Sequence, residues 1–564
     1  MSELPPIILF FVAILLVLIT RGTLRNIILL ATPVLGGLHL WLNIEPGMTV
    51  THTILGFELI IMRTDKLSLL FGYLFCLASA ISTIYAWHIK DTTQQIAGLM
   101  YAGAAVGAVF AGDLITLFVC WELLALSSVF LVWARGTERS YNAGMRYLIF
   151  QVMSGLFLLA GALVHYHNTG SLAFDHIGLE SVAGWLILIA FGIKCAFPFL
   201  HSWLVDAYPE GTVTGTVFLS AFSTKVAVYA LARGFAGEEI LVYVGVTMAC
   251  FPIFYAVIEN DLRKVLAYSL INQVGFMVAG IGIGTALALN GAVAHAFSHV
   301  IYKGLLFMSM GAVLYRVGNI NGSDLGGLYK TMPKTTVFCI VGALSISAFP
   351  LFSGFISKSM VITAMIEENY SYLWLLMLFA SAGVFHHAGI KVPYFAFFAH
   401  DSGLRPKEAP INMLIAMGIS ACLCVFLGAQ PQYLYSLLPW EVDYWPYDTT
   451  HVLAQLQLLF FSALAFVWLN KRGMYPPELR STNLDVEWIY RKLVPAGIRR
   501  SVTFLGDTKE LMVASMMAPM RGIRHTFSQS SVAKYHLSES WPTGSMVFWI
   551  AIILAAYLLL DIFG

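Results

Sequence analysis

Long apolar runs recur along the whole chain, separated by short polar stretches. A run of about 18 or more apolar residues is long enough to cross a bilayer as a helix. The first run, PPIILFFVAILLVLIT, lacks a basic start and a small-residue cleavage site, so it is interpreted as a span and not as a removed signal. The pattern predicts an all-α polytopic membrane protein with about sixteen transmembrane helices. They begin near residues 6, 26, 67, 96, 114, 147, 184, 211, 238, 265, 288, 336, 373, 411, 451 and 546.

Basic residues are distributed unevenly between the two alternating sets of loops. One set contains little beyond Arg63, Lys66 and Arg233. Because basic loops stay in the cytoplasm, the other set is predicted to be cytoplasmic. The protein is then a multi-pass protein of a bacterial cell (inner) membrane, with both termini on the non-cytoplasmic side. The cytoplasmic set comprises Arg21, Arg25, Lys90, Arg135, Arg139, Arg146, Arg263, Lys264, Arg316, Lys330, Lys334, Arg405, Lys407, Lys471 and Arg472.

Residues 473–545 depart from this pattern. They begin with the breaker YPPEL and carry apolar residues at helical spacing in LDVEWIYRKLVPAGIRR and KELMVASMMAPMRGIRHTF. Such a stretch is typical of a helix along a membrane surface, which Pro495 and Pro519 would kink. We predict a cytoplasmic lateral amphipathic helix there, over about residues 485–535, before a last span at 546–564. The alternative is a loosely ordered loop.

Composition agrees with a membrane protein and excludes several function classes. Of 564 residues, 59% are hydrophobic and 11% are charged, and the net charge of +1 gives no indication of a nucleic-acid partner. The seven cysteines lie mostly in apolar runs and lack metal-ligand spacing. The sequence contains no nucleotide loop, flavin fingerprint or hydrolytic triad, so no cofactor or metal is expected. Any chemistry would belong to partner subunits.

Several predicted spans contain ionisable residues near their middle. A charge at the bilayer centre costs at least ~2.5–3.5 kcal/mol, so it is rare unless it faces a partner or water. A single one could reach the interface by snorkelling, but charges in so many separate spans indicate a path for protons. The residues are Glu122, Lys194, Lys225, Lys303 with His295 and His299, Lys358, and Lys391 with His386 and His387.

His295, His299 and Lys303 follow one another at intervals of four residues and therefore share one helix face. Histidine titrates near neutral pH, and a buried lysine loses its proton readily. This stripe could therefore pass a proton along the helix. The alternative is a set of histidines that face a polar core without any role in transport.

Prolines near two of the lysines predict broken helices. Pro198 follows Lys194, and Pro350 with Gly354 precedes Lys358. Proline removes a backbone donor and frees a carbonyl one turn before it. Broken helices at membrane depth line cavities and build ion sites in transporters. The match of GIKCAFPFLH with GIKVPYFAFFAH, at residues 389–400, is weak evidence for an internal repeat.

Six motifs together carry a family resemblance: GDLITLFVCWEL, GIKCAFPFLHSWLVDAYPEG, STKVAVYAL, DLRKVLAYSLINQVGFM, HAFSHVIYKGLLF and GFISK. Over residues 60–430 the chain resembles the antiporter-like membrane subunits of respiratory complex I, Mrp-type cation/proton antiporters and related membrane hydrogenases. The interval between Lys194 and Lys225 is similar to that of the family's two central lysines. The core is most similar to the D-type subunit of Mrp antiporters, whereas the C-terminus resembles the distal complex I subunit.

The resemblance implies two inverted five-helix repeats, each with a discontinuous helix, and a chain of buried water and charged groups along the membrane plane. The expected organisation is N-terminal transmembrane helices at 1–95, a first half-channel repeat at 96–257, a second at 258–430, an additional transmembrane helix at 431–472, the lateral helix at 473–545 and a transmembrane anchor at 546–564.

Roles for the relay residues are also implied by the resemblance. Glu122 would match the glutamate that pairs with the discontinuous-helix lysine, here Lys194, and Lys225 would be the next relay group. An ion pair at ~4 Å is worth about 4 kcal/mol at an effective dielectric of 20. Opening the pair would leave the Lys194 ammonium without its counter-charge and favour release of its proton. The pair would therefore act as a switch.

In the second half, Lys303 with the two histidines of its stripe would form the central relay, and Lys358 would be the terminal residue. Lys391 falls on no family motif and is a relay candidate by its position alone.

The expected function is an ion-translocating subunit of a multi-subunit membrane complex, which conducts protons or exchanges monovalent cations for protons. Its expected partners are other membrane subunits, lipids, protons and Na⁺. Two alternatives stay open. One is a self-contained transporter of a small solute. The other is a membrane module of an enzyme-coupled complex, of the complex I or hydrogenase type or for inorganic-carbon uptake with a zinc-bearing subunit.

Overall fold

The structure is a computed structural model that describes residues 4–503 apart from 55, 442 and 482. Contacts divide the chain into two units, Met1–Val486 and Glu487–Gly564. The predicted span at 546–564 and most of the predicted lateral helix lie outside the described residues.

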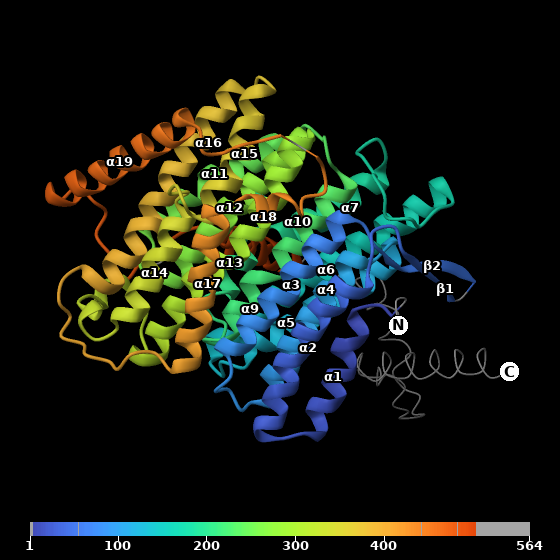
Figure 1. Cartoon of the computed structure of the whole chain (residues 1–564), viewed down its shortest axis with the longest axis horizontal. Coiled ribbons are helices and arrows are strands. Elements are labelled where there is room, and N and C mark those ends of the chain that lie inside the picture. The colour runs from blue at the N-terminus through green and yellow to red at the C-terminus, as the bar shows by residue number, and fades with distance from the viewer. Residues whose placement is uncertain (1–3, 55, 442, 482, 504–564) are drawn as a thin grey trace, which may run out of the picture. The chain divides into compact units, whose positions relative to one another are not determined.

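The first unit is a bundle of helices with one small hairpin (Figure 1). Its N-terminal part comprises α1 (Ile7–Ile19), α2 (Gly22–Asn43), β1 (Thr49–Ile54), β2 (Phe57–Arg63), α3 (Lys66–Tyr85), α4 (Thr92–Phe110), α5 (Leu114–Trp133), α6 (Glu138–Thr169), α7 (Val182–Cys195), α8 (Ser202–Ala207), α9 (Gly215–Ala221) and α10 (Ser223–Gly234).

The rest of the unit continues in the same manner. It comprises α11 (Ile240–Ile258), α12 (Leu262–Ile283), α13 (Ala286–Val317), the short turns η1 (Gly322–Asp324) and η2 (Leu328–Lys330), α14 (Pro333–Ile346), α15 (Ser353–Glu367), α16 (Ser371–Val384), the π-helices η3 (Phe385–Lys391) and η4 (Tyr394–Phe398), α17 (Ile411–Ala429), α18 (Gln432–Tyr435) and α19 (Thr449–Lys471).

The predicted helical membrane fold is confirmed. In the described part, eleven helices are long and apolar enough to cross a membrane. They coincide with eleven of the predicted spans. Three further predicted spans are the shorter apolar helices α1, α7 and α14, and another coincides with the 19-residue α4. The number of sixteen spans stays a prediction, because the last one lies outside the described residues.

The hydropathy pattern does not reveal the hairpin between α2 and α3. Strands β1 and β2 pair antiparallel, with a register irregularity between Val50 and Thr51. The side chains of β1 are mostly exposed, whereas Leu59 and Met62 of β2 are buried. One buried face on a short hairpin is too little apolar surface to stand out in a window sized for a membrane span.

Two groups of helices repeat the same geometry. Helices α6 and α13 both have 32 residues and begin at residues 138 and 286, and each ends on a left-handed glycine, Gly170 or Gly318. The same interval separates Asp113 from Asp261, which accept hydrogen bonds from the first backbone amides of α5 and α12. Both aspartates also form an isolated bridge, to Ala173 and Asn321. The inversion of the two repeats and their exact bounds stay predictions.

A helix break recurs in each group, as the prolines predict. After α7, Ala196 and Phe199 have positive φ angles of 63° and 68°. After α14, Ala348 and Leu351 have φ angles of 57° and 73°. Left-handed φ angles are uncommon for residues other than glycine. They cost energy and persist only where the surrounding structure enforces them.

Hydrogen bonds close the two breaks in the same way. The amide of Phe197 donates to the carbonyl of Gly192, and that of Phe349 donates to the carbonyl of Leu344. The chain therefore builds one strained turn twice, within the sequences AFPF and AFPL.

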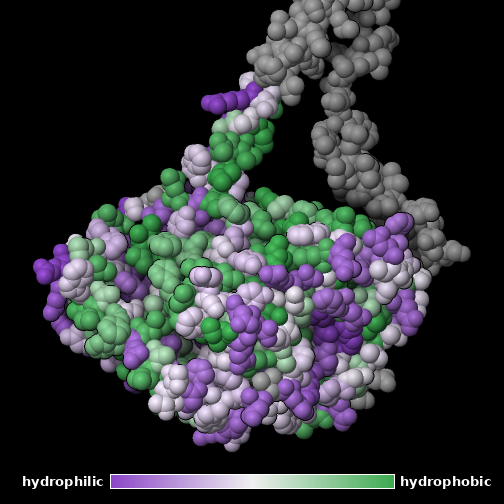
Figure 2. Space-filling model, turned by 90° about the horizontal axis from the view of Figure 1, so that it is seen from above, coloured by the Kyte–Doolittle hydropathy of each residue, from purple (hydrophilic) through white to green (hydrophobic). Residues whose placement is uncertain are grey.

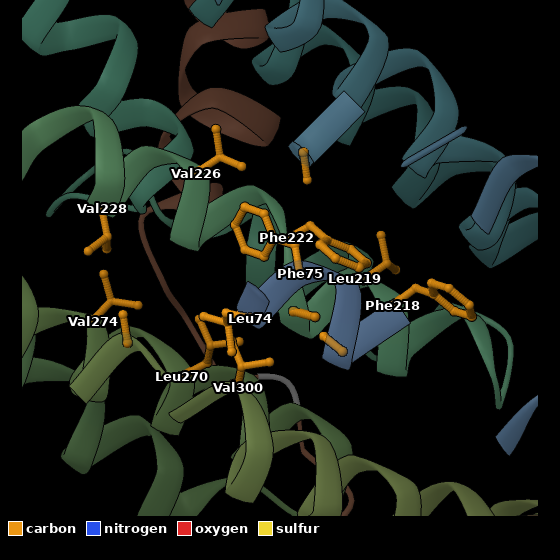
Figure 3. Packing of buried hydrophobic residues seen from close by; sticks show 14 of the residues in the cluster. Leu74, Phe75, Phe218, Leu219, Phe222, Val226, Val228, Leu270, Val274 and Val300 are labelled. Atoms are coloured by element: carbon orange, nitrogen blue, oxygen red, sulfur yellow. The ribbon is translucent and has the colours of Figure 1, made fainter. Parts of the chain in front are cut away.

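The core lies where the two groups meet α3. In Figure 3, Leu74 of α3 lies beside Leu270 of α12 and Val300 of α13, and Phe75 of α3 lies near Leu219 of α9 and contacts the Phe222 ring. Nearly all of α12 and α13 is buried, with 94% of the most apolar window of each helix inside the bundle. The ionisable stripe on α13 is therefore held away from lipid.

The periphery of the first unit is apolar and less covered. Only 28% of the α2 window and 11% of the α19 window are buried, and these helices lie at opposite ends of the bundle (Figure 1). Hydrophobic residues cover large areas of the face in Figure 2, with hydrophilic residues gathered in separate groups. Lipid or other membrane subunits are suited to such surfaces.

The described part of the second unit, residues 487–503, is helical and includes the π-helix η5 (Ile489–Leu493). Val494, Ile498 and Val502 are exposed apolar residues at intervals of four, so they share one face. This stretch agrees with the start of the predicted amphipathic helix.

Helices α11 and α12 pack unusually closely, and this contact yields a prediction. A Cβ on Gly275 would lie 2.5 Å from the backbone nitrogen of Ala249, whereas a Cβ on Gly304 of α13 would meet nothing within 4 Å. We expect Gly275→Ala to destabilise the protein by about 1–3 kcal/mol, because the backbone of α11 must move.

The matched change Gly304→Ala should be neutral or slightly stabilising, since alanine favours helix by about 1 kcal/mol over glycine. Thermal unfolding of the purified protein in detergent measures both. Equal stability of the two variants would contradict a close contact between Gly275 and the backbone of α11.

Candidate functional site

The first group of helices holds Lys194 at the break after α7. Its side chain is fully buried, and Nζ donates a hydrogen bond of 2.5 Å to the backbone carbonyl of Trp121 on α5. The same ammonium lies 4.2 Å from the centroid of the Trp121 ring. A cation over an indole face is attracted by the ring quadrupole, so Trp121 stabilises Lys194 in two ways.

Glu122 follows Trp121 directly, and its carboxylate packs against α6. A Cβ built on Gly155 would overlap Oε1 of Glu122, and that oxygen is buried without a hydrogen-bond partner among the described residues. Glu122 and Lys194 are near enough to interact electrostatically. No ion pair of 4.0 Å or less joins them in the described part of the chain. Their predicted role as a pair stays a prediction, because Lys194 bonds to a carbonyl here.

Lys225 lies just after a second interruption, at Phe222 between α9 and α10. Its Nζ donates to the carbonyl of Ser220 at 2.7 Å and to Oγ1 of Thr224 at 3.1 Å. Phe222 itself has φ and ψ of −104° and −68°, away from ideal helix values. Lys225 is fully buried, so the carbonyl next to this interruption takes the place of water around its ammonium.

The stripe on α13 lies on one buried face, as its spacing predicts. The Nδ1 atom of His295 lies 2.9 Å from Oγ of Ser357 on α15, and its Nε2 lies 3.3 Å from the hydroxyl of Tyr302. Tyr302 in turn donates to Oε1 of Gln273 on α12 at 2.9 Å. His295 therefore connects α12, α13 and α15 through hydrogen bonds that can change direction with its tautomer.

His299 and Lys303 differ from His295, because they have no hydrogen-bond partner among the described residues. Both ring nitrogens of His299 and Nζ of Lys303 are buried and unpartnered. The rings of His295 and His299 lie 6.4 Å apart, and the Lys303 ammonium lies 5.8 Å from the centroid of the Phe307 ring. Unpartnered buried polar groups are uncommon in proteins and mark functional positions or hydrated paths.

Lys358 lies near the second break, on α15. Its Nζ donates to the carbonyl of Ile346, the last residue of α14, at 3.2 Å and lies 4.9 Å from the Phe276 ring. Lys358 also lines a cavity of about 300 Å³ whose other walls include His451 and Gln455 of α19.

Lys391, which no motif explains, has the densest set of partners. It ends the π-helix η3, and its Nζ donates to the carbonyls of Ala256, Val257 and Glu259 at 3.2, 2.7 and 2.6 Å. These carbonyls lie at the C-terminal end of α11, where backbone acceptors are unused and the helix dipole is negative. A carboxylate oxygen of Glu478 lies 2.9 Å from the same ammonium.

The stretch after α19 also contacts the first group of helices. Asp485 accepts a hydrogen bond of 2.7 Å from the hydroxyl of Tyr268, and its carboxylate lies 3.2 Å from Nε2 of His201. Burial raises the pKa of Asp485, but the contacts with His201 and Tyr268 outweigh it, so the pKa is lowered overall. His201 belongs to the motif around Lys194 and had no role from sequence.

The structure therefore brings the candidates together in part. Lys194 lies beside Trp121 and Glu122, and the stripe on α13 reaches α15 through Ser357. Lys391 is held by the end of α11 and by Glu478 from the stretch after α19. Glu478 and Asp485 were not foreseen, because they lie in the segment 473–545, which is predicted to be a lateral helix along the membrane surface; the only signal is that two acidic residues follow the start of the YPPEL breaker.

No group of three or more His, Cys, Asp or Glu residues within the described ranges could hold a metal ion. The candidate site consists of lysines, histidines, glutamates and main-chain carbonyls. These groups hold and move protons or coordinate monovalent cations, and they provide no nucleophile with an adjacent base.

Comparison with known proteins agrees with this chemistry. Residues 111–385 match the family model described as NADH:quinone oxidoreductase/Mrp antiporter, TM. A Na(+)/H(+) antiporter subunit of Alkalihalophilus pseudofirmus, designated D, is 28% identical over 64% of this chain and 78% of its own length. NADH-quinone oxidoreductase subunit N of Desulforudis audaxviator is 30% identical over 63% of this chain and 80% of its own length.

A solved structure supports the fold. A chain of the Mrp complex from Dietzia sp. superposes with a TM-score of 0.77 over 98% of this chain, at 22% identity, and this chain covers 66% of its length. The alignment to the quinone oxidoreductase subunit, the family match across both groups of helices and this shared fold agree. The chain belongs to the NADH:quinone oxidoreductase/Mrp antiporter transmembrane family.

Proposed function

We propose that this chain is an ion-translocating subunit of a multi-subunit membrane complex, which moves protons, in exchange for a monovalent cation or alone, through its buried lysines, histidines and glutamate. One observation carries the proposal. Ionisable groups continue from the half-buried Glu122 and the buried Lys194 in the first group of helices, through the buried α13 stripe, to the buried Lys358 and Lys391 in the second.

Each group in this series is suited to accept and release a proton. The lysines are fully or almost fully buried, so their charged forms depend on a few nearby oxygens instead of bulk water. The two histidines of the stripe lie on α13, the helix of the second group that packs against α9 and α10 of the first. A path of this kind needs no bound substrate pocket, which argues against a transporter of a small solute.

Membrane placement supports the same function. The chain is a multi-pass membrane protein by its spans and family. We propose the inner membrane of a bacterium, with the basic loops in the cytoplasm and both termini on the other side. Na⁺ is a candidate counter-ion because the similar protein of Alkalihalophilus pseudofirmus is a Na(+)/H(+) antiporter subunit.

Partners are proposed from the surface and from the relatives. The similar proteins are subunits of larger complexes by their names, and the poorly buried α2 and α19 leave apolar surface for neighbouring subunits and lipid. The described start of the amphipathic helix, residues 487–503, carries Arg491, Lys492, Arg499 and Arg500 suited to anionic headgroups.

The second candidate is a membrane module of a redox complex. The observation that favours it is the 30% identity to an NADH-quinone oxidoreductase subunit. Purification of the complex from native membranes separates the two. Co-purified redox subunits would favour this candidate, whereas small membrane subunits alone would favour an antiporter.

The stripe on α13 generates the first prediction. We expect Lys303→Ala to abolish translocation and His295→Ala to slow it, because water can bridge one missing step but cannot replace the central lysine. The initial rate of pH-gradient formation in vesicles that contain the whole complex measures both. Lys330→Ala is the control, since that lysine is half exposed and pairs with Asp401. Undiminished gradients in both stripe variants would refute the relay.

The contact between Glu122 and Gly155 generates the second prediction. Glu122→Gln removes the charge, and Gly155→Ala places a methyl group where the carboxylate lies. We expect both to lower the transport rate at least about tenfold, equivalent to about 1.4 kcal/mol of barrier, while the protein still inserts. Gly418→Ala is a matched control, because its Cβ would only touch the Phe338 ring at 3.5 Å. Normal transport by Glu122→Gln would contradict the role.

A further inference from the structure

Lys391 occupies the same place in the second group of helices as Lys225 does in the first. In each group the broken helix is followed by a span that is itself interrupted. The first of these spans is α9 with α10, and the second is α16 with the π-helix η3. Each carries one buried lysine beside its interruption. Lys225 belongs to a recognised motif, so its counterpart is a candidate for an equivalent proton-transfer step.

A titratable histidine lies on the same π-helix as Lys391. His387 lies on the same π-helix, four residues earlier, and both of its ring nitrogens are buried without a hydrogen-bond partner in the described residues. His387 is near enough to Lys303 to interact electrostatically. π-Helical segments are rare and frequently occur at functional sites. His387 is therefore a titratable group within the electrostatic reach of both Lys303 and Lys391.

A second titratable group, the carboxylate of Glu478, pairs directly with Lys391. The side chain of Lys391 is 0% exposed, and that of its ion-pair partner Glu478 is 5% exposed. Glu478 comes from the segment after α19, and Tyr475 fixes this segment by stacking on His386 with ring centroids 5.4 Å apart. Burial raises the pKa of Glu478, although Lys391 opposes the shift, so its carboxylate accepts a proton more readily than an exposed glutamate.

Among the neighbouring charges, Glu259 acts electrostatically on both Lys391 and Glu478, but its own carboxylate is held by other partners. Glu259 lies 3.0 Å from Lys264 and accepts a hydrogen bond from Asn483. Arg480 pairs with Asp324 at 2.7 Å, and both lie further out, with 73% and 22% of their side chains exposed. The remaining titratable neighbours are His386 and His387 on η3.

We propose that Lys391 and Glu478 form a proton-exchange site that connects the path to one surface of the membrane; this rests on the proposed function. The Lys391 ammonium passes one proton to the Glu478 carboxylate: an N–H bond breaks and an O–H bond forms. The pair changes from ammonium and carboxylate to amine and carboxylic acid. Glu478 then releases the proton to water, and Lys391 takes the next proton from the side of His387.

The pair suits this step because its total charge stays zero. Moving a lone charge into the membrane interior is costly, but a transfer within the pair creates no net charge. The ammonium donates to three carbonyls at the end of α11, and the neutral amine keeps two N–H groups that can still bond to two of them, so Nζ stays in place after the transfer. Both carboxylate oxygens of Glu478 are buried, so exchange with water depends on movement of the segment that carries this residue.

Transport by the complete complex in vesicles tests the proposal. We expect Glu478→Gln to lower the initial rate of pH-gradient formation at least about tenfold. Glu478→Asp should restore most of the rate with a changed pH profile, because a carboxylate remains. Infrared difference spectra during turnover should contain a carboxylic C=O band that Glu478→Gln removes. A residue that only holds the segment in place would alter neither the profile nor this band.

Arg480→Ala is the control within the same segment, because it breaks the outer pair with Asp324 without touching Lys391. It should leave the rate close to that of the unmodified complex. Unchanged transport by Glu478→Gln, or equal losses in Glu478→Gln and Arg480→Ala together with poorer assembly, would overturn the proposal and make the segment a structural brace. Inactive Lys303→Ala beside active Glu478→Gln would refute this site alone, whereas active Lys303→Ala would refute the proposed function.

Discussion

Three of the five lysines buried in the described bundle take the oxygen atoms around their ammonium groups from helix ends and interruptions, whereas Lys194 uses a carbonyl within α5 and Lys303 has no oxygen acceptor in the described residues. Backbone carbonyls inside a regular helix are already bonded, so free ones occur at ends and breaks. Lys358 bonds to the carbonyl of Ile346 at the end of α14, and Lys391 bonds to three carbonyls at the end of α11. Lys225 uses the carbonyl of Ser220 beside the interruption at Phe222. The broken helices are thus the means by which lysines are kept inside an apolar protein.

This requirement explains why the same strained turn is built twice. Ala196 and Ala348 adopt left-handed conformations before the two prolines, and each turn ends a helix at the depth of a lysine. At the first turn the lysine is the helix's own Lys194, which reaches across to Trp121. At the second, Lys358 lies on the following helix and reaches back. The two turns have the same backbone geometry. The lysine lies on the helix before the turn in the first half and on the helix after the turn in the second.

Sequence patterns predict this architecture well because hydropathy and proline act locally. The starts of the spans, the breaks beside Pro198 and Pro350 and the shared face of His295 and Lys303 all follow from residues near one another in the chain. The contact of Lys391 with Glu478 does not, since it depends on how the segment after α19 folds back onto η3.

Other features also escaped sequence patterns for physical reasons. The pairing of Glu122 with Lys194 stays a prediction, but the hydrogen bond from Lys194 to the neighbouring Trp121 carbonyl was not foreseen, because spacing alone cannot distinguish a carboxylate acceptor from a main-chain one. The packing of Gly155 against Glu122 joins two helices. A glycine in an apolar run does not indicate which side chain of another helix packs against it.

In the proposed path, Lys303 differs from the other four lysines because no oxygen accepts from its ammonium in the described residues. The cavity at Lys358 is lined by His451 near the start of α19, and Glu478 follows the end of that helix. A helix of this length spans about 34 Å at about 1.5 Å per residue, comparable to a bilayer core. A path that stabilised a proton equally at every step between these ends would leak. In the proposed path, an ammonium at Lys303 without an oxygen acceptor would raise the energy of the middle step, so protons would cross it only when the charges on either side change.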